Sequence, residues 1–213
     1  MTLAPLIAEW RATPQAAALA TRYHEPWRHY HDWSHPLAML RHLEAAADDG
    51  VALHDPAAAI GFVLWHDAIY DPQATHGRNE RLSAALCAAE MPALAPRESV
   101  ARAIAAIEAT IDHRSPAGVA DAALLLDIDL SILGADEGAF DVYDAGIAAE
   151  YAHVPAAAYR SGRAAVLQRF LARERLYVTP WAHERWEQRA RRNLERAIAR
   201  LGADVSAATP LQA

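Results

Sequence analysis

Apolar residues recur along most of this chain at the spacing of three to four residues that is typical of an α-helix. Near the C-terminus, Trp186, Ala190, Leu194, Ala197 and Leu201 fall on one helical face. About a quarter of all positions are alanine and 9 are glycine, which favours helix over strand. The predicted fold class is all-α, with helices at 3–12, 14–24, 35–48, 56–67, 78–90, 97–112, 120–133, 137–151, 156–174 and 180–201.

Capping residues mark where several of these helices begin. Three predicted helices start with a side-chain acceptor followed by proline at the first helical position. They are Thr13-Pro14, Asp55-Pro56 and Thr179-Pro180. Asp136 predicts a further cap, and Ser34, two residues before a proline, predicts a looser one.

The apolar segment Leu124–Leu130 fits a buried strand as well as a helix. It contains Asp127 and Asp129, which would share a face on a strand but lie about 200° apart on a helix. Two carboxylates in an apolar segment need compensation, and a cation is the simplest form of it. On a helix, only one of the two can face a common site.

The length of 213 residues is enough for one domain that folds without a disulfide or a structural metal. All 20 basic residues are arginine, and the 27 acidic residues bring the net charge to −7. This balance argues against a nucleic-acid polymer or an anionic membrane as partner. We predict a single domain over 1–203 and a flexible C-terminal tail over 204–213, and a homo-oligomer stays open.

The single cysteine, Cys87, excludes a disulfide framework and fits a reducing compartment. No apolar run approaches the length of a membrane span, and the N-terminal segment does not resemble a signal peptide. The predicted localisation is therefore cytoplasmic.

Histidine is frequent, with 11 residues, and imidazole with carboxylate is a ligand pair for divalent ions. His66-Asp67 ends the most apolar predicted helix, after Ile60–Trp65. A carboxylate there costs several kcal/mol unless a cation or strong donors compensate it. Taken alone, the pair favours a structural role, in which Asp67 caps a helix or pairs with an arginine and His66 binds a carbonyl.

His31 and His35 lie in a second histidine-rich segment, Tyr30–His35. A helix that begins near His35 leaves His31 in the entering turn. The segment is not a zinc-protease motif, because Asp32 stands where glutamate would be needed. Taken alone, it favours a polar turn packed on neighbouring tryptophans.

The order of these motifs resembles the HD-domain superfamily of metal-dependent phosphohydrolases, and within it a small bacterial group of predicted HD phosphohydrolases. The resemblance rests on His35, then His66-Asp67, then an acid within Asp127–Gly134, and it extends over residues 23–201. It implies a compact multi-helix bundle with a metal site between helices. The implied metal ligands are His35, His66, Asp67 and Asp129.

The resemblance also implies roles for other residues. His31 matches a position that protonates the leaving group in HD-type cyclic-nucleotide phosphodiesterases, and Asp67 belongs to the catalytic set as well as to the ligands. Asn79-Glu80 resembles a motif of the small group, which makes Glu80 an auxiliary acid or base. His113 lies where some relatives have ligands for a second ion. Since no His-His pair precedes the last aspartate, that second ion stays open.

The implied activity is hydrolysis of a small phosphate ester, a nucleotide or another phosphomonoester, by attack of metal-bound hydroxide. The ligand set suits Mn, Mg, Fe, Co, Ni or Zn. Because the chain has no lysine, arginine must supply the positive charge that binds phosphate. The predicted substrate-binding residues are Arg78, Arg81, His113, Arg160 and Arg163, with a surface ion pair as the alternative for each arginine.

Four alternatives lead to other functions. An HD-type di-iron oxygenase would use His113 with His76, and a non-catalytic metal-binding helical module would keep the ligands without turnover. A haloacid-dehalogenase-like phosphatase would need Leu124–Asp129 as one of several strands, which the rest of the pattern does not predict. A ferritin-like di-iron bundle needs two Glu-x-x-His motifs, and the chain has one, at Glu150–His153.

Overall fold

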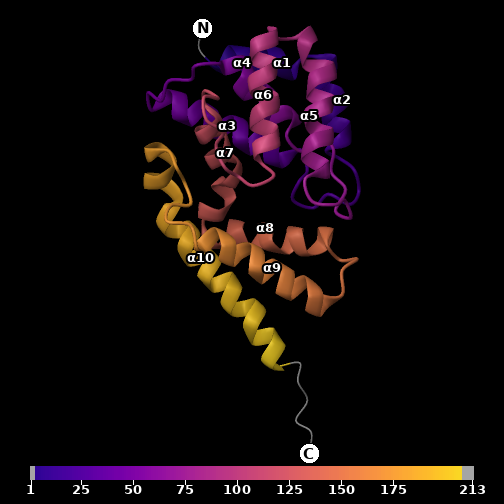
Figure 1. Cartoon of the computed structure of the whole chain (residues 1–213), viewed down its shortest axis with the longest axis vertical. Coiled ribbons are helices and arrows are strands. Elements are labelled where there is room, and N and C mark those ends of the chain that lie inside the picture. The colour runs from indigo at the N-terminus through magenta and orange to yellow at the C-terminus, as the bar shows by residue number, and fades with distance from the viewer. Residues whose placement is uncertain (1–2, 208–213) are drawn as a thin grey trace, which may run out of the picture. The chain divides into compact units, whose positions relative to one another are not determined.

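The computed structural model describes residues 3–207, and within them the chain is entirely helical apart from its connections (Figure 1). The α-helices are α1 Leu3–Arg11, α2 Pro14–Arg22, α3 Ser34–Asp48, α4 Pro56–Trp65, α5 Arg78–Glu90, α6 Arg97–Ala109, α7 Ala122–Asp129, α8 Glu137–Glu150, α9 Ala156–Leu171 and α10 Pro180–Ala207. Two 3₁₀ helices, η1 Met91–Ala93 and η2 Leu130–Gly134, complete the described part. The all-α prediction is confirmed, and the segment Leu124–Leu130 is helical rather than a strand.

The helices divide into two compact units, Met1–Asp129 and Leu130–Ala213. The first unit contains α1 to α7 with η1, and the second contains η2 and α8 to α10. The single domain over 1–203 stays a prediction. Helix α10 continues to Ala207, so the predicted tail 204–213 begins as helix, and residues 208–213 lie outside the described residues. None of the described helices has the length and apolar composition needed to cross a membrane.

The caps predicted from the sequence are present at four helices. The side chain of Thr13 accepts from the Ala16 amide, that of Asp136 from Ala139 and that of Thr179 from Ala182. The fourth is Asp55, at α4. The looser cap at Ser34 is wrong, because α3 begins at Ser34 itself and has no side-chain cap at the preceding residue. The carboxylate of Asp32 instead accepts from the Ser34 amide, 2.8 Å away.

Helix α4 is the central helix of the first unit, since every residue from Ala58 to Trp65 is buried. It packs against α3, α5, α6 and α7. Burial on all sides explains why its sequence is apolar throughout rather than on one face. Because the core fixes this helix, the two residues that follow it, His66 and Asp67, begin from a rigid position.

The start of α4 is held by two carboxylates. Asp121, whose left-handed φ is 64°, accepts from the His54 and Asp55 amides at 3.1 and 2.8 Å. Asp55 in turn caps α4 through the Ala58 amide at 3.0 Å and pairs with Arg102. Burial alone would raise the pKa of Asp55, but these donors outweigh it and lower the pKa below its ordinary value. The Asp55 carboxylate therefore stabilises the fold only while it is ionised.

Replacing Asp55 with alanine should lower the free energy of unfolding at pH 7 by about 1 to 2 kcal/mol, mainly through loss of the cap. The ion pair adds little to this figure, because Arg102 is 44% exposed. A lowered pKa in the folded state means that the carboxylate contributes fully above its unfolded pKa of about 3.9 and loses its effect as pH falls through the folded value. The difference in unfolding free energy between wild type and Asp55→Ala, measured by urea unfolding, should thus become smaller below about pH 4. An equal difference at pH 3 and pH 7 would contradict this account.

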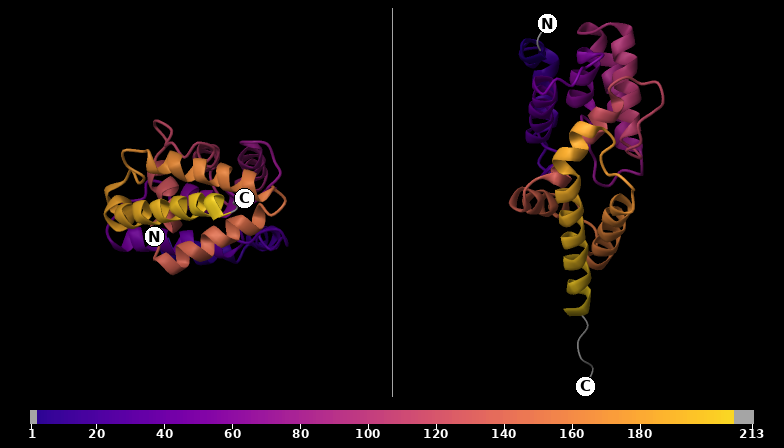
Figure 2. Two further views of the ribbon diagram at one scale, coloured as in Figure 1. Left: turned by 90° about the horizontal axis from the view of Figure 1, so that it is seen from below. Right: turned by 90° about the vertical axis from the view of Figure 1, so that its left-hand side faces the viewer.

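In the second unit, α10 packs against η2 and α9, and both views of Figure 2 show α9 beside α10. The predicted apolar face of α10 is confirmed for four of its five members: Trp186, Ala190, Leu194 and Ala197 are buried. The Asn193 amide donates to the carbonyls of Leu133 and Ala135, at 2.9 and 3.0 Å. Helix α10 is therefore held against η2 by both apolar contact and hydrogen bonds.

Gly134, at the end of η2, is the point of closest approach to α10. A Cβ atom there would lie 2.8 Å from both the Cα and the carbonyl oxygen of Trp186, which are backbone atoms that cannot move aside alone. Gly134→Ala should therefore lower the unfolding free energy by about 2 kcal/mol or more, as overpacking does. Gly162→Ala is the matched control, because nothing lies within 4 Å of its added Cβ on α9. In thermal unfolding, the melting temperature of Gly162→Ala should equal or exceed that of wild type, because alanine favours a helix more than glycine does. A Gly134→Ala variant as stable as this control would contradict the close packing at Gly134.

Candidate metal centre

The predicted metal ligands lie where three helices of the first unit begin or end. His35 is in the first turn of α3, His66 and Asp67 directly follow α4, and Asp129 is the last residue of α7. Helix α3 packs against both α4 and α7. The burial of three helix faces therefore brings together residues that are 94 positions apart in the chain.

His35, His66 and Asp67 form a buried cluster that could hold a metal ion. The Nε2 atoms of the two histidines are 3.2 Å apart. The Oδ2 atom of Asp67 lies 3.0 Å from the Nε2 atom of His66 and 3.9 Å from the Nε2 atom of His35. The Oδ1 of Asp129 lies 3.0 Å from His35 Nε2 and 3.5 Å from His66 Nε2. Ligands at about 2.1 Å from one ion, at right angles, are about 3 Å apart. The spacing thus fits the donor set of a single divalent ion.

The outer nitrogens of both histidine rings are occupied by other partners. The Nδ1 of His66 lies 3.1 Å from the carbonyl oxygen of Val63, which can only accept, so this nitrogen carries the proton. The Nδ1 of His35 lies 3.1 Å from the Tyr30 hydroxyl. In each ring the Nε2 atom is left to face the cluster. This is the arrangement that orients histidine in metal sites.

The electrostatics of the cluster favour a positive charge at its centre. Burial alone would lower the pKa of His66, but the carboxylates of Asp67 and Asp129 raise it well above its ordinary value. Burial would likewise raise the pKa of each carboxyl, and the charge of His66 reverses this and holds both pKa values well below the usual range. Two ionised carboxylates in one buried site need a cation, and a divalent ion meets this need when it displaces the proton.

The cluster is buried on its histidine side and open on its carboxylate side. The side chains of His35 and His66 are 5% and 1% exposed, whereas that of Asp67 is 21% exposed. Asp129 lies between these values, at 11%. Solvent therefore reaches the cluster from its carboxylate side.

His31 lies beside the cluster, in the turn before α3, as the sequence predicts. Its ring stacks on Tyr70 with centroids 4.4 Å apart, and its centroid lies 6.3 Å from that of His35. The backbone carbonyl of Tyr70 accepts from the indole of Trp27 at 2.9 Å. Stacking on Tyr70 thus holds the His31 ring near that of His35.

His113 contacts the outer oxygen of Asp129, with its Nε2 atom 3.1 Å from Oδ2. The oxygen that faces the histidines is Oδ1, so His113 orients the carboxylate. His113 has a φ of 48°, a conformation that costs about 1 to 3 kcal/mol outside glycine and tends to persist at functional sites. The sequence suggested substrate or a second ion for this histidine, and the structure places it against the last aspartate.

Other predicted site residues are not brought into contact with the cluster. Glu80 and Arg78 lie in the first turn of α5, and Arg81 donates to the Gly77 carbonyl. In the described part of the chain, Glu80 makes no hydrogen bond or ion pair with the cluster. The neighbouring Asn79 exchanges two hydrogen bonds with the Asp71 backbone, so this motif closes the loop before α5. The roles given to Glu80, Arg78 and Arg81 stay predictions.

Arg160 and Arg163 belong to α9 in the second unit. The guanidinium of Arg163 donates twice to Asp144, at 3.1 and 2.9 Å, and its side chain is 8% exposed. An ion pair is therefore an observed role for Arg163. Phosphate binding by either arginine stays a prediction.

Two residues that the sequence analysis missed hold the turn after α4. The buried Tyr23 hydroxyl donates to the Leu64 carbonyl at 3.2 Å and accepts from the Asp67 amide at 3.3 Å. Arg28 donates to the Asp67 carbonyl at 2.8 Å. The sequence does contain a sign of the role of Arg28, which lies in a segment rich in aromatic residues. A charged residue among large apolar ones indicates a buried polar contact.

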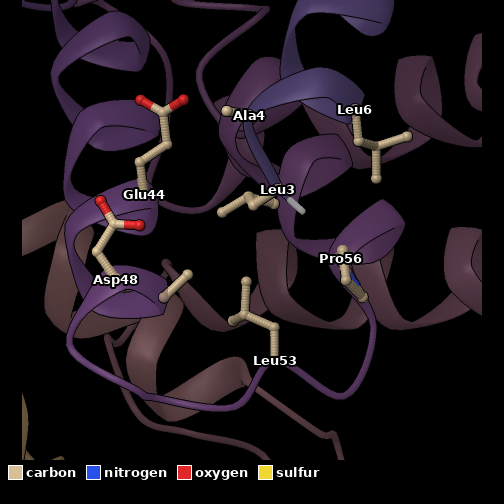
Figure 3. A pocket seen from close by; sticks show the side chains of 8 residues that line it. Leu3, Ala4, Leu6, Glu44, Asp48, Leu53 and Pro56 are labelled. Atoms are coloured by element: carbon tan, nitrogen blue, oxygen red, sulfur yellow. The ribbon is translucent and has the colours of Figure 1, made fainter. Parts of the chain in front are cut away.

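A pocket of about 600 Å³ lies elsewhere in the first unit, between α1, the end of α3 and the loop that leads to α4. Figure 3 shows Glu44 and Asp48 on one side of it and Leu3, Leu6 and Leu53 on the other. None of the cluster residues lines this pocket. It is therefore distinct from the candidate metal centre.

No known protein family, no curated protein and no solved structure matches this chain in comparisons of sequence and fold. The chemistry of the candidate centre is therefore argued from its own residues.

We expect Mn²⁺ to raise the melting temperature of the wild-type protein by several degrees, because an ion that binds only the folded state adds its binding free energy to stability. Asp67→Asn keeps the shape of the side chain but removes its charge, and should abolish this increase. His153→Ala, at an exposed histidine in the turn after α8, should retain it. An increase that survives in Asp67→Asn would place the ion elsewhere.

Proposed function

We propose that this protein is a metal-dependent phosphohydrolase that cleaves a small phosphate ester, either a nucleotide or another phosphomonoester. The observation that carries the proposal is the pair of buried Nε2 atoms, of His35 and His66, 3.2 Å apart beside the Asp67 carboxylate. The motif order that resembles the HD-domain superfamily supports the same class of reaction. The all-α fold of the described residues agrees with it.

The residues that would hold the ion are His35, His66, Asp67 and Asp129. Four protein donors leave positions free on an ion that takes five or six ligands, which suits an ion that must also contact substrate. When bound, such an ion lowers the pKa of a water molecule and withdraws charge from a phosphoryl oxygen. The open carboxylate side of the cluster is where we place the phosphate.

The protein itself must supply a proton to the departing alkoxide. His31 suits this role because an imidazole exchanges protons near neutral pH and because stacking on Tyr70 holds its ring near that of His35. Burial raises the pKa of Asp67, whereas His66 and, by a smaller amount, His31 lower it. His31 therefore lies within electrostatic reach of the Asp67 carboxylate.

His31→Ala should lower kcat by about 10²-fold or more for an alkyl phosphate, whose leaving group must be protonated. The loss should be much smaller for p-nitrophenyl phosphate, because p-nitrophenolate leaves without a proton. Steady-state kinetics with the two substrates measures this difference. Equal losses on both would contradict a proton-donor role for His31.

The reaction class is tested by a screen of phosphorylated metabolites with Mn²⁺, Co²⁺, Ni²⁺ and Mg²⁺, with the metal content of the purified protein measured in parallel. We expect hydrolysis that depends on the added ion and disappears in Asp67→Ala. Hydrolysis that is unchanged in Asp67→Ala would overturn the proposal.

One observation favours a second candidate, an HD-type di-iron oxygenase. The Nε2 atom of His113 lies 3.1 Å from the outer oxygen of Asp129, so these two residues could help to hold a second ion. Two irons per chain together with oxygen consumption would favour this candidate. A single labile ion with phosphatase activity would favour the phosphohydrolase.

A further inference from the structure

Arg28 is a buried arginine in the connection between α2 and α3, and its side chain is 0% exposed. Its one ion-pair partner is Glu25, whose carboxylate accepts from Nε at 3.0 Å and is itself 30% exposed. Among the described residues, the other hydrogen-bond partners of the guanidinium are backbone carbonyls. A cation that is fully removed from water but held mainly by carbonyl groups is costly to bury, so its position needs a specific reason.

The carbonyls bound by Arg28 belong to two loops that carry the chemistry of the candidate centre. Nη1 donates to the carbonyl of His31 at 2.9 Å and to that of Asp67 at 2.8 Å, and Nη2 donates to that of Ala68 at 3.2 Å. His31 lies in the irregular segment before α3, and Asp67 lies in the turn after α4. One nitrogen atom thus joins the backbone of the proposed proton donor to the backbone of a proposed metal ligand.

Arginine is the side chain that can make this set of contacts. Its planar guanidinium has five N–H donors in a fixed fork, whereas a lysine ammonium has three donors around one point. The guanidinium carbon also lies 4.9 Å from the ring centroid of Tyr23 and 5.3 Å from that of Tyr70. Tyr70 is the ring on which His31 stacks, and the Tyr23 hydroxyl accepts from the Asp67 amide. The groups around Arg28 are therefore the same groups that surround the candidate centre.

We propose that Arg28 is the positioning residue of this centre: by binding the His31 and Asp67 carbonyls with one guanidinium, it fixes the proton donor relative to the metal ligand. The inference rests on the proposed function, because that function gives His31 and Asp67 their roles. Arg28 contacts backbone atoms only on these two residues, so it acts on geometry and takes no part in proton transfer. Its removal should loosen the ligand set and uncouple His31 from it.

The test compares full-length Arg28→Lys with Arg102→Lys, a matched control at the partly exposed arginine that pairs with Asp55. Isothermal titration with Mn²⁺ should show affinity weakened about tenfold to a hundredfold in Arg28→Lys, the usual loss when a partner of a ligand is removed. Affinity in Arg102→Lys should match wild type. Circular dichroism should show both variants helical at the temperature of the titration. In Arg28→Ala, millimolar guanidinium chloride should restore Mn²⁺ affinity, and sodium chloride should not.

A second measurement separates positioning from general stability. If Arg28 places His31, the effect of His31→Ala on kcat for an alkyl phosphate should be at least tenfold smaller in the Arg28→Lys background than in wild type, since coupled residues are not additive. Additive effects together with unchanged Mn²⁺ affinity would overturn the role of Arg28 and leave the proposed function standing. Loss of helical structure in Arg28→Ala that guanidinium does not reverse would also overturn it, because Arg28 would then be a core residue. A wild-type protein that binds none of Mn²⁺, Mg²⁺, Fe²⁺, Co²⁺, Ni²⁺ and Zn²⁺ would remove the proposed function itself, and if another of these ions binds in place of Mn²⁺, the same titrations are made with that ion.

Discussion

Around the C-terminal end of α4, the carboxylates of Asp67 and Asp129 lie within about 3 to 4 Å of the Nε2 atoms of two buried histidines. In the described part of the chain, neither carboxylate forms an ion pair with an arginine, so charge balance falls to the imidazoles or to an added cation. A structure that gathered these acids only for packing would pay several kcal/mol for it. Because helix packing brings the two acids together at three helix termini, this point requires a positive charge.

The centre combines a rigid core with irregular connections. Helix α4 is buried on all sides and gives the His66-Asp67 turn a fixed origin, whereas His31 and His113 lie in segments without regular structure. Such segments leave backbone carbonyls and amides without helical partners, and buried groups of this kind must find others. Side chains from neighbouring segments supply them, which ties the loops to the core. Loop residues can thereby reach the precision that catalysis requires.

Local chemistry made much of this structure predictable from the sequence. Asp55-Pro56 and Thr179-Pro180 fix helix starts through neighbours a few residues away, and the structure begins helices there. The convergence of His35 with His66-Asp67 was predicted only through a resemblance in motif order, because their meeting depends on how helices pack. The predicted cap at Ser34 failed for a related reason: the competing acceptor, Asp32, lies two residues earlier and its position depends on the loop. Contacts between side chains and distant carbonyls leave no periodic trace in a sequence, which is why the hydrogen bonds around the Asp67 turn were not foreseen.

The left-handed backbone conformation at His113 limits which residues can replace it during evolution. Glycine adopts such a conformation without strain, and histidine, asparagine and aspartate adopt it more readily than other residues with a side chain. Substitution by glycine, asparagine or aspartate would therefore keep the main chain in place while removing the imidazole that contacts Asp129. Retention of histidine here across descendants of this gene, in place of these three residues, would be a sign of selection on the contact with that carboxylate rather than on the backbone.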